Sequence, residues 1–299
     1  MAIEQHQHVV RSIVEDHRLT YRQRIQSLAL AAENVLEPPA VSEACALALE
    51  KGLICDMAEG HAPHRPRYTL PDYEIAFAHG SAFLELAPPT CFDDAITFLL
   101  AMYANVPSIT GYPVWFGEID RLLEPFADEL DNAELRTHLR RFWVLLDRMF
   151  PDAFAHANLG PADGRVARAA LAVHRHISQV VPNLTLKVDP TLTPDSLLRD
   201  AMETVVAAGQ PHLVNHPMMV ADLGEQYGVV SCYNSLPIGG GAHTLVRLNL
   251  KEAALIHAGT PDGFLTDTLP RVVELTSELM WFVAGARGLR LVSGLEGAA

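Results

Sequence analysis

The residue best placed to do chemistry is Cys232, which lies in the segment YGVVSCYNSLP. An apolar run ends at this single thiol, and a polar stretch that is expected to form a loop follows it as far as Pro237. Three consecutive glycines, Gly239–Gly241, come shortly after. A lone cysteine in an apolar strand is most often a small core residue. Functional groups of α/β folds gather at strand ends, however, so the position of Cys232 also favours a reactive role.

A second candidate is a metal site made by Cys55, His61 and His64. Their spacing, Cys-x5-His-x2-His, could supply three ligands to a metal ion. The segment is loop-like and offers no obvious fourth ligand. We therefore expect a packed loop at this position and no metal site.

A third candidate is a Cys-His hydrolase in which Cys232 works with His216 or His243. Such a site requires an imidazole within hydrogen-bond reach of the thiol and a third group that orients the imidazole. The chain has 14 histidines, so pairs of this kind arise easily. The glycines after Cys232 lack the spacing and the lysine of a phosphate-binding loop, and they favour a tight backbone path instead.

Composition excludes several classes of protein. The chain has 299 residues, of which 49% are hydrophobic, so it is long enough to bury a sizeable core. A net charge of −14 and the lack of a long basic run argue against a nucleic-acid partner. There is no long apolar segment and no basic, apolar leader, which predicts a cytoplasmic protein without a membrane partner. In a reducing compartment the four cysteines are expected to be free thiols: Cys45, Cys55, Cys91 and Cys232.

Residues 1–180 are expected to form a mostly helical N-terminal region. Apolar periodicity and acidic first turns predict helices over 21–36, 92–106, 132–150 and 163–180. Proline-rich segments are expected to form turns within the same folded unit, at 60–73, 87–89 and 110–117.

Residues 181–299 are expected to form an α/β region. Alternating or apolar runs predict strands at 184–188, 211–215, 227–233 and 243–250. A helix is predicted from Asp195 to Ala208, between Pro194 and Gly209, and another from Lys251 onward.

Four separated segments share their order and spacing with one known superfamily. They are FGEIDRLLEPF at 116–126, PNLT at 182–185, Gly209-x-Pro211 with Asn215, and Tyr227-Gly228 followed by Cys232. Together they resemble the glycyl radical enzymes, which include pyruvate formate-lyase, glycerol and diol dehydratases and anaerobic ribonucleotide reductase. The likeness is most continuous with the YjjI-type members, through EGHAPHRPRYTLPDY, DAFAHANLGP and SCYNSLPIGGG, and it covers nearly all of residues 10–280.

The resemblance implies a fold and a mechanism. The fold would be an N-terminal helical region followed by the first half of a glycyl-radical-enzyme α/β barrel. In such enzymes a backbone radical on a C-terminal glycine takes a hydrogen atom from a cysteine, and the resulting thiyl radical abstracts hydrogen from a small-molecule substrate. By this likeness Cys232 is the thiyl residue. The family binds no cofactor of its own and relies on a partner, a radical-SAM activase with an iron–sulfur cluster.

The sequence departs from the family at three points. Ser231 stands where pyruvate formate-lyase has a first cysteine, which argues against acyl transfer, and Asn234 stands where the dehydratases have a glutamate base. The C-terminal glycine loop has no counterpart before Ala299. The expected pocket residues around Cys232 are Ser231, Asn234, Asn215, His216 and His243.

The leading hypothesis is therefore a truncated radical enzyme of the YjjI type, whose glycine comes from missing sequence or from a second chain that supplies the C-terminal half. Two alternatives stay open. One is an inactive remnant or a binding subunit of a split enzyme, and the other is the Cys-His hydrolase described above.

Overall fold

The computed structural model describes residues 3–33, 41–56, 67–82, 84–106, 113–149, 154–177, 179–230, 234–242 and 245–286. The chain divides into two compact units. The sheet unit is continuous and spans Tyr68–Gly241, and the terminal unit combines Met1–Arg67 with Ala242–Ala299.

The sheet unit is built around a parallel sheet of four strands whose order follows the chain. The strands are β3 (Val114–Glu118), β4 (Ala155–Leu159), β5 (Asn183–Val188) and β6 (His212–Asn215). Helices α7 (Asn132–Arg148), α8 (Arg165–His176) and α9 (Asp195–Ala208) connect successive strands. Strand, helix and parallel strand in this order form repeated βαβ units, so all four strands have their carboxyl ends at one edge of the sheet.

Burial explains why these segments form central strands. Every residue of β4 is buried, as are the four central residues of β5. A parallel strand covered on both faces carries a nearly continuous apolar run instead of an alternating one. The polar residues within β4 and β5 are therefore exceptions to the pattern.

The connecting helices are amphipathic, and at the start of α7 and of α8 carboxylates bind the first backbone N–H groups. Asp131 and Glu134 form a reciprocal capping box at the start of α7. At α8 the carboxylate of Glu124 accepts hydrogen bonds from the backbone N–H groups of Arg165 (2.8 Å) and Val166 (2.9 Å). The negative charge of Glu124 thus stabilises the positive end of the α8 dipole.

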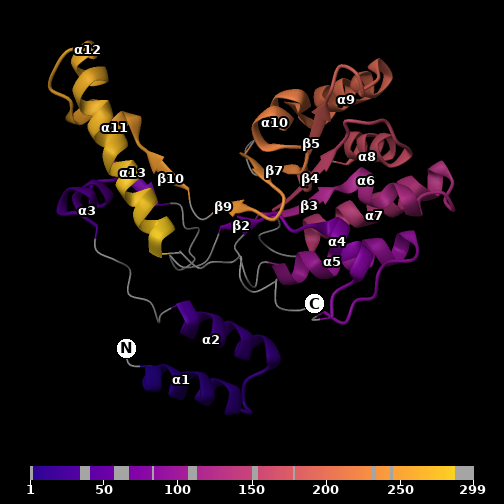
Figure 1. The fold of residues 1–299 in the computed structure, drawn as a ribbon, viewed down its shortest axis with the longest axis horizontal. Coiled ribbons are helices and arrows are strands. Elements are labelled where there is room, and N and C mark those ends of the chain that lie inside the picture. The colour runs from indigo at the N-terminus through magenta and orange to yellow at the C-terminus, as the bar shows by residue number, and fades with distance from the viewer. Residues whose placement is uncertain are drawn as a thin grey trace. The chain divides into compact units, whose positions relative to one another are not determined.

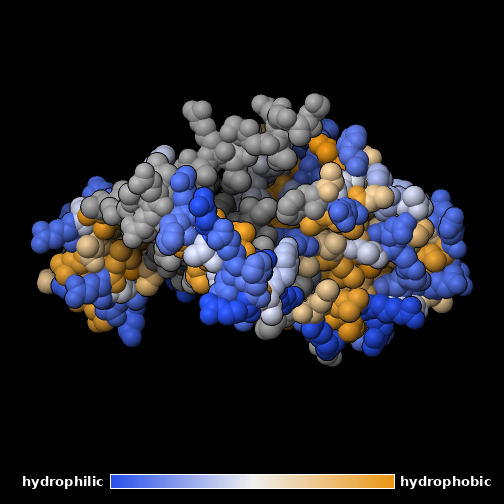
Figure 2. Space-filling view, turned by 90° about the horizontal axis from the view of Figure 1, so that it is seen from below, coloured by the Kyte–Doolittle hydropathy of each residue, from blue (hydrophilic) through white to orange (hydrophobic). Residues whose placement is uncertain are grey.

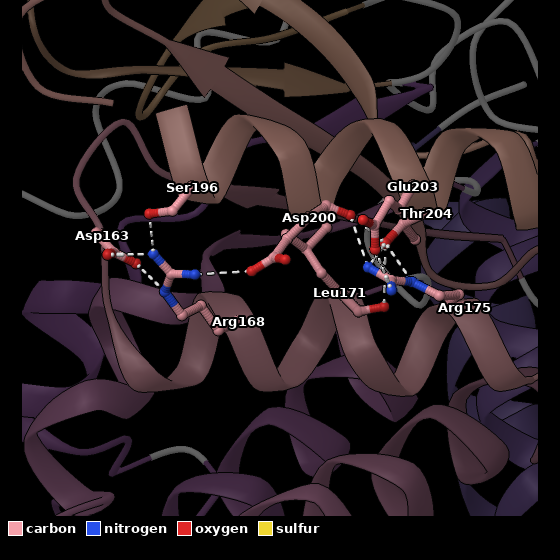
Figure 3. A network of polar contacts seen from close by, with 8 residues as sticks. All are labelled: Asp163, Arg168, Leu171, Arg175, Ser196, Asp200, Glu203 and Thr204. Carbon is pink, nitrogen blue, oxygen red and sulfur yellow. Dashed lines mark hydrogen bonds and ion pairs between the residues drawn. The ribbon is translucent and has the colours of Figure 1, made fainter. Parts of the chain in front are cut away.

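Two arginines on α8 join it to α9 (Figure 3). Arg168 donates to Asp163 (2.7 and 2.8 Å) and to Asp200 (2.7 Å), while Arg175 donates to Glu203 (2.7 Å). These pairs lie on the partly exposed outer side of the helix pair. The pairs with Asp200 and Glu203 connect two helices of the scaffold, and the pair with Asp163 joins α8 to the loop that precedes it.

A β-hairpin lies against the sheet on the side away from α7, α8 and α9 (Figure 1). Its strands are β7 (Tyr227–Val230) and β8 (Asn234–Pro237), which pair in antiparallel register. β7 packs against β3 and β4. The hairpin follows β6 through helix α10 (His216–Leu223).

The remaining elements of the sheet unit are short. They are β2 (Tyr68–Thr69), α4 (Tyr73–His79), α5 (Phe92–Asn105), α6 (Ile119–Leu123) and η2 (Glu124–Phe126). β2 pairs with β9 (Gly241–Ala242).

The terminal unit has its own small core. Helices α3 (Glu43–Glu50), α11 (Leu250–Ile256) and α13 (Leu269–Ala286) accompany an antiparallel pair, β1 (Ile54–Asp56) with β10 (Val246–Leu248). Cys45, Ile54 and Val272 are among the buried residues of this core. The unit also contains α1 (Ile3–Glu15), α2 (Tyr21–Glu33), α12 (Pro261–Gly263) and the π-helical turn η3 (Phe264–Thr268). No helix in the described part of the chain is both long and apolar enough to cross a membrane.

The structure confirms the predicted α/β class and most predicted elements. The helices predicted at 21–36, 92–106, 132–150 and 163–180 correspond to α2, α5, α7 and α8, and the predicted strands at 184–188 and 211–215 correspond to β5 and β6. Two predictions were wrong. Residues 110–117 were expected to form a turn but contain the start of β3, and the polar stretch after Cys232 forms β8. Because β3 and β4 precede residue 181, the sheet begins well before the expected boundary between the two regions.

Candidate active site

The hairpin of β7 and β8 carries the cysteine segment. Val230 pairs with Asn234 across the hairpin, and Ser231 and Cys232 come between them in the sequence. Those two residues lie outside the described part of the chain. Val230 is fully buried, so β7 is inaccessible to solvent up to the residue that precedes the Ser-Cys pair.

Asn158 on β4 bonds to the backbone of β7. Its side-chain Nδ2 donates to the carbonyl oxygen of Val229 (2.9 Å), and its Oδ1 accepts from the Val229 N–H (2.8 Å). Oδ1 also accepts from Trp115 Nε1 (3.3 Å). The neighbouring Gly228 lies against the same indole ring, where an added Cβ would come within 2.4 Å of a ring carbon. β7 therefore needs glycine at this position to approach the sheet so closely.

Lys187 near the end of β5 bonds to β7 as well. Its side chain is fully buried, and Nζ donates to the carbonyl oxygen of Tyr227 (2.8 Å) and pairs with Glu118. Glu118 in turn pairs with Arg121 (2.9 Å). Burial lowers the pKa of Lys187, while the Glu118 carboxylate acts in the opposite direction and favours the charged amine.

His216 starts α10 directly after β6. Its Nδ1 lies 2.9 Å from the hydroxyl of Tyr227, and the two rings stack with centroids 5.7 Å apart. Burial, and then the positive charge of Lys187, lower the pKa of His216 below its usual value. Burial raises the pKa of Tyr227, so this phenol keeps its proton and can donate it to Nδ1. His216 is thus held as a neutral imidazole at pH 7.

Asp120 in α6 is a buried carboxyl group, 6% exposed. Its two oxygens accept from the backbone N–H groups of Gly160 (2.7 Å) and Arg121 (2.9 Å). Burial raises the pKa of Asp120 to about 7, against the opposite effect of these hydrogen bonds. This carboxyl group can therefore gain or lose a proton near neutral pH.

Glu118, Asp120, Arg121 and His216 line a cleft of about 700 Å³ at the carboxyl edge of the sheet. Its lining also includes Glu225, together with residues 160–164 of the loop after β4. In open parallel sheets, ligands bind at this edge, because the loops that follow each strand converge there.

The predicted pocket residues lie in different places in the structure. His216 lines the cleft. Asn215 is exposed and caps α10 by accepting from the Met218 N–H (3.1 Å). Asn234 donates to the Tyr68 hydroxyl (2.6 Å). Ser231, Cys232 and His243 fall outside the described residues, so their roles stay predictions.

The predicted absence of a metal site is likewise untested at its main candidate. Cys55 is exposed, and its proposed co-ligands His61 and His64 lie outside the described residues. Within the part of the chain that the structure describes, no three His, Cys, Asp or Glu side chains are grouped as metal ligands would be.

The sequence analysis missed the polar residues that surround β7. Asn158, Lys187 and Asp120 were not singled out, and neither was Glu118 at the end of β3. A signal was present: Asn158 and Lys187 stand inside apolar strand segments, ANL and LKV, where a buried polar side chain requires a partner.

The fold of the chain matches that of a protein whose structure has been solved. A solved structure, the anaerobic ribonucleotide reductase from Thermotoga maritima with citrate in the active site, matches 95% of this chain and 57% of its own chain, with a TM-score of 0.58 and 12% sequence identity. At that identity the match concerns the fold alone.

Sequence comparison then identifies the family. The model of the YjjI-like glycyl radical enzymes matches residues 19–282, and the chain belongs to this family. It is 45% identical over 264 residues to the protein YjjI of Escherichia coli K12, and 38% identical over 271 residues to an uncharacterized protein of Haemophilus influenzae Rd. The alignments cover 88% and 89% of this chain but only 51% and 52% of the two relatives. The chain thus spans about half the length of the curated relatives it matches.

Proposed function

We propose that this chain supplies the cysteine-bearing half of a glycyl radical enzyme, with Cys232 as the hydrogen-atom carrier. The observation that carries the proposal is the hairpin: β7 is buried along its whole length and leads directly into Ser231 and Cys232. A thiyl radical must be kept from competing hydrogen donors, so a strand that is excluded from solvent suits a residue with this role.

The proposed reaction balances as two hydrogen-atom transfers, each of which is later reversed. The glycine radical takes the hydrogen of the Cys232 S–H bond, which leaves a C–H bond on glycine and a thiyl radical on sulfur. The thiyl radical then takes a hydrogen atom from a C–H bond of the substrate and becomes a thiol again. The rearranged radical then takes a hydrogen atom back from the S–H bond, which gives the product and restores the thiyl radical. The thiyl radical finally takes the hydrogen of the glycine C–H bond, which restores the glycine radical and the thiol. The glycine would come from sequence outside these 299 residues or from a second polypeptide, and the family resemblance implies a radical-SAM activase as partner.

The cleft at the carboxyl edge is the proposed place for the substrate. Among the described residues, its lining contains six carboxyl groups, whereas Arg121 is the one side chain that is always positively charged. Glu118 is neutralised by Lys187 and Arg121, but Asp128 and Glu225 add negative charge. This balance disfavours phosphorylated and carboxylate substrates, since like charges repel in a partly enclosed site. A neutral or cationic small molecule fits the cleft better.

An EPR measurement in D₂O tests the role of Cys232 without knowledge of the substrate. The chain would be combined anaerobically with the second half of the Escherichia coli relative and with a radical-SAM activase. The S–H group exchanges with solvent deuterium, so reversible transfer between Cys232 and glycine carries deuterium to the glycine carbon. The doublet that the α-hydrogen causes should then collapse to a singlet.

The Cys232→Ser variant is the matched control, because a hydroxyl O–H bond is too strong to enter this exchange. Its radical should form and keep the doublet. A doublet that also persists in the parent protein would contradict the hydrogen-carrier role. If no radical forms under any condition, the inactive-remnant hypothesis gains support. Rapid aerobic alkylation of Cys232 with a depressed thiol pKa would favour the Cys-His hydrolase instead.

A further inference from the structure

One edge of β7 faces side chains where a neighbouring strand would otherwise be. In the described structure β7 pairs with β8 alone. The Ile238 N–H donates to the carbonyl oxygen of Gln226 (2.9 Å), so these two residues form a hydrogen-bonded pair of the ladder. Hydrogen-bonded pairs alternate along an antiparallel ladder. Tyr227 and Val229 must therefore direct their backbone N–H and C=O groups toward the edge opposite β8.

Side chains from the parallel sheet satisfy that edge. Lys187 donates to the carbonyl oxygen of Tyr227 (2.8 Å). Asn158 bonds both backbone groups of Val229, at 2.8 Å to the N–H and 2.9 Å to the carbonyl oxygen. A carboxamide carries the same donor and acceptor as a peptide group. Asn158 thus completes the ladder of β7 as if it were one residue of a further strand.

We propose that Asn158 is a positioning residue, which holds the hairpin that carries Cys232 at a fixed distance from the parallel sheet. Val229 is three residues before Cys232, so the two hydrogen bonds fix the backbone only three residues from the proposed reacting cysteine. Hydrogen-atom transfer tolerates little displacement of the reacting groups, and an error of about 1 Å can cost about a hundredfold in rate. The importance of this role for catalysis rests on the proposed function, whereas the effect of Asn158 on the hairpin backbone can be tested by itself.

The chemistry of the amide distinguishes positioning from simple core packing. Asn158 is fully buried, so a side chain of similar shape fills its volume. Aspartate keeps an acceptor for the Val229 N–H but gives no donor to the carbonyl oxygen when ionised, and leucine gives neither. A packing role predicts that Asn158→Leu leaves the backbone motion of the hairpin unchanged. A positioning role predicts that this substitution makes the hairpin backbone more mobile.

Hydrogen–deuterium exchange of the full chain tests this proposal. Peptides covering residues 227–230 would be compared with peptides covering 184–188 of β5, in Asn158→Asp and Asn158→Leu. We expect exchange in the hairpin to accelerate about tenfold or more, with Leu at least as fast as Asp, while β5 changes little. Asn183→Asp is the matched control, because this substitution makes the same chemical change in the same sheet. Asn183 is the first residue of β5 and pairs with His156 of β4. It should leave the hairpin unchanged.

Alkylation of Cys232 by iodoacetamide, measured by mass spectrometry of its peptide, gives a second readout. It should accelerate in both Asn158 variants and not in Asn183→Asp. Equal acceleration of exchange in β5 and in the hairpin, or none in either, would overturn the positioning role. Both measurements work without a radical. A failure of the D₂O experiment would therefore leave this inference standing, and a failure here would leave the role of Cys232 standing.

Discussion

Lys187 and Tyr227 contact each other twice. The Nζ atom of Lys187 donates to the Tyr227 carbonyl oxygen at 2.8 Å and also lies 3.9 Å from the centroid of the Tyr227 ring. A fully buried ammonium group is thus surrounded by a carbonyl dipole, an aromatic face and the Glu118 carboxylate. This arrangement joins the end of β5 to the start of the cysteine hairpin.

The Lys187→Met variant should be destabilised by about 3 kcal/mol, because it leaves Glu118 mostly buried without its main partner. Urea denaturation of the purified chain measures the change. Adding Glu118→Gln to this variant should recover most of the loss, since the double variant buries no unpaired charge at this point. If the double variant is as unstable as the sum of the two single variants, the Lys187–Glu118 pair does not carry the stability.

Two buried groups should change the stability of the chain with pH in opposite directions. His174 in α8 is fully buried, and within the described structure neither of its ring nitrogens has a hydrogen-bond partner. Burial lowers its pKa from 6.5 to about 4, so the unfolded state binds the proton first as the pH falls. His174 therefore does not reduce the free energy of unfolding above about pH 6.5, and it reduces this free energy by about 3 kcal/mol as the pH falls to 4.

Asp120 acts in the other direction. Burial raises its pKa from 3.8 to about 7, so the folded state binds the proton first. Its contribution to stability is complete below about pH 4, is lost as the pH rises to about 7, and amounts to about 4 kcal/mol. The two groups nearly cancel between pH 4 and 6.5. We expect urea midpoints of the His174→Leu variant to rise as the pH falls through this range, and those of Asp120→Asn to fall. Parallel curves for both variants would contradict this assignment.

The sequence predicted the scaffold better than the site, for a physical reason. Helix α9 could be bounded at Asp195 and Ala208 because Pro194 and Gly209 mark its ends locally. β4 was missed because a strand buried on both faces has no alternating pattern, and His156 and Asn158 interrupt its apolar run. The contact of Asn158 with Val229 spans 71 residues, and only the fold brings the two together.

The pKa of His216 should report the charge of Lys187. Burial and then the Lys187 charge lower this pKa, so Lys187→Met should raise it toward the usual value of about 6.5. Titration of the histidine ring signals by NMR measures the change. Tyr227→Phe is the matched comparison, because it removes the hydroxyl at 2.9 Å from Nδ1 and keeps the Lys187 charge. If Lys187→Met leaves the pKa of His216 unchanged, the charge of Lys187 has no effect on the titration of His216.

The isolated chain should associate with itself through the β6 side of the sheet unit. In the described structure β6 pairs with β5 on one edge and with no strand on the other. Leu213 in β6 is 44% exposed and Val206 in α9 is 87% exposed. The space-filling view shows apolar residues, in orange, among the hydrophilic ones on the face it presents (Figure 2). An open strand edge beside exposed apolar side chains favours edge-to-edge pairing.

Light scattering measures this association as a function of concentration. Leu213→Lys should reduce the average mass toward that of the 32.7 kDa monomer, because a charged side chain on an open edge opposes pairing. Leu145→Lys on α7 is the matched control, since Leu145 is similarly exposed, at 42%, and lies on a helix. It should leave the association unchanged. A parent chain that stays monomeric at every concentration would show that the β6 edge is not a site of self-association, and equal effects of both lysines would assign the association to general apolar exposure.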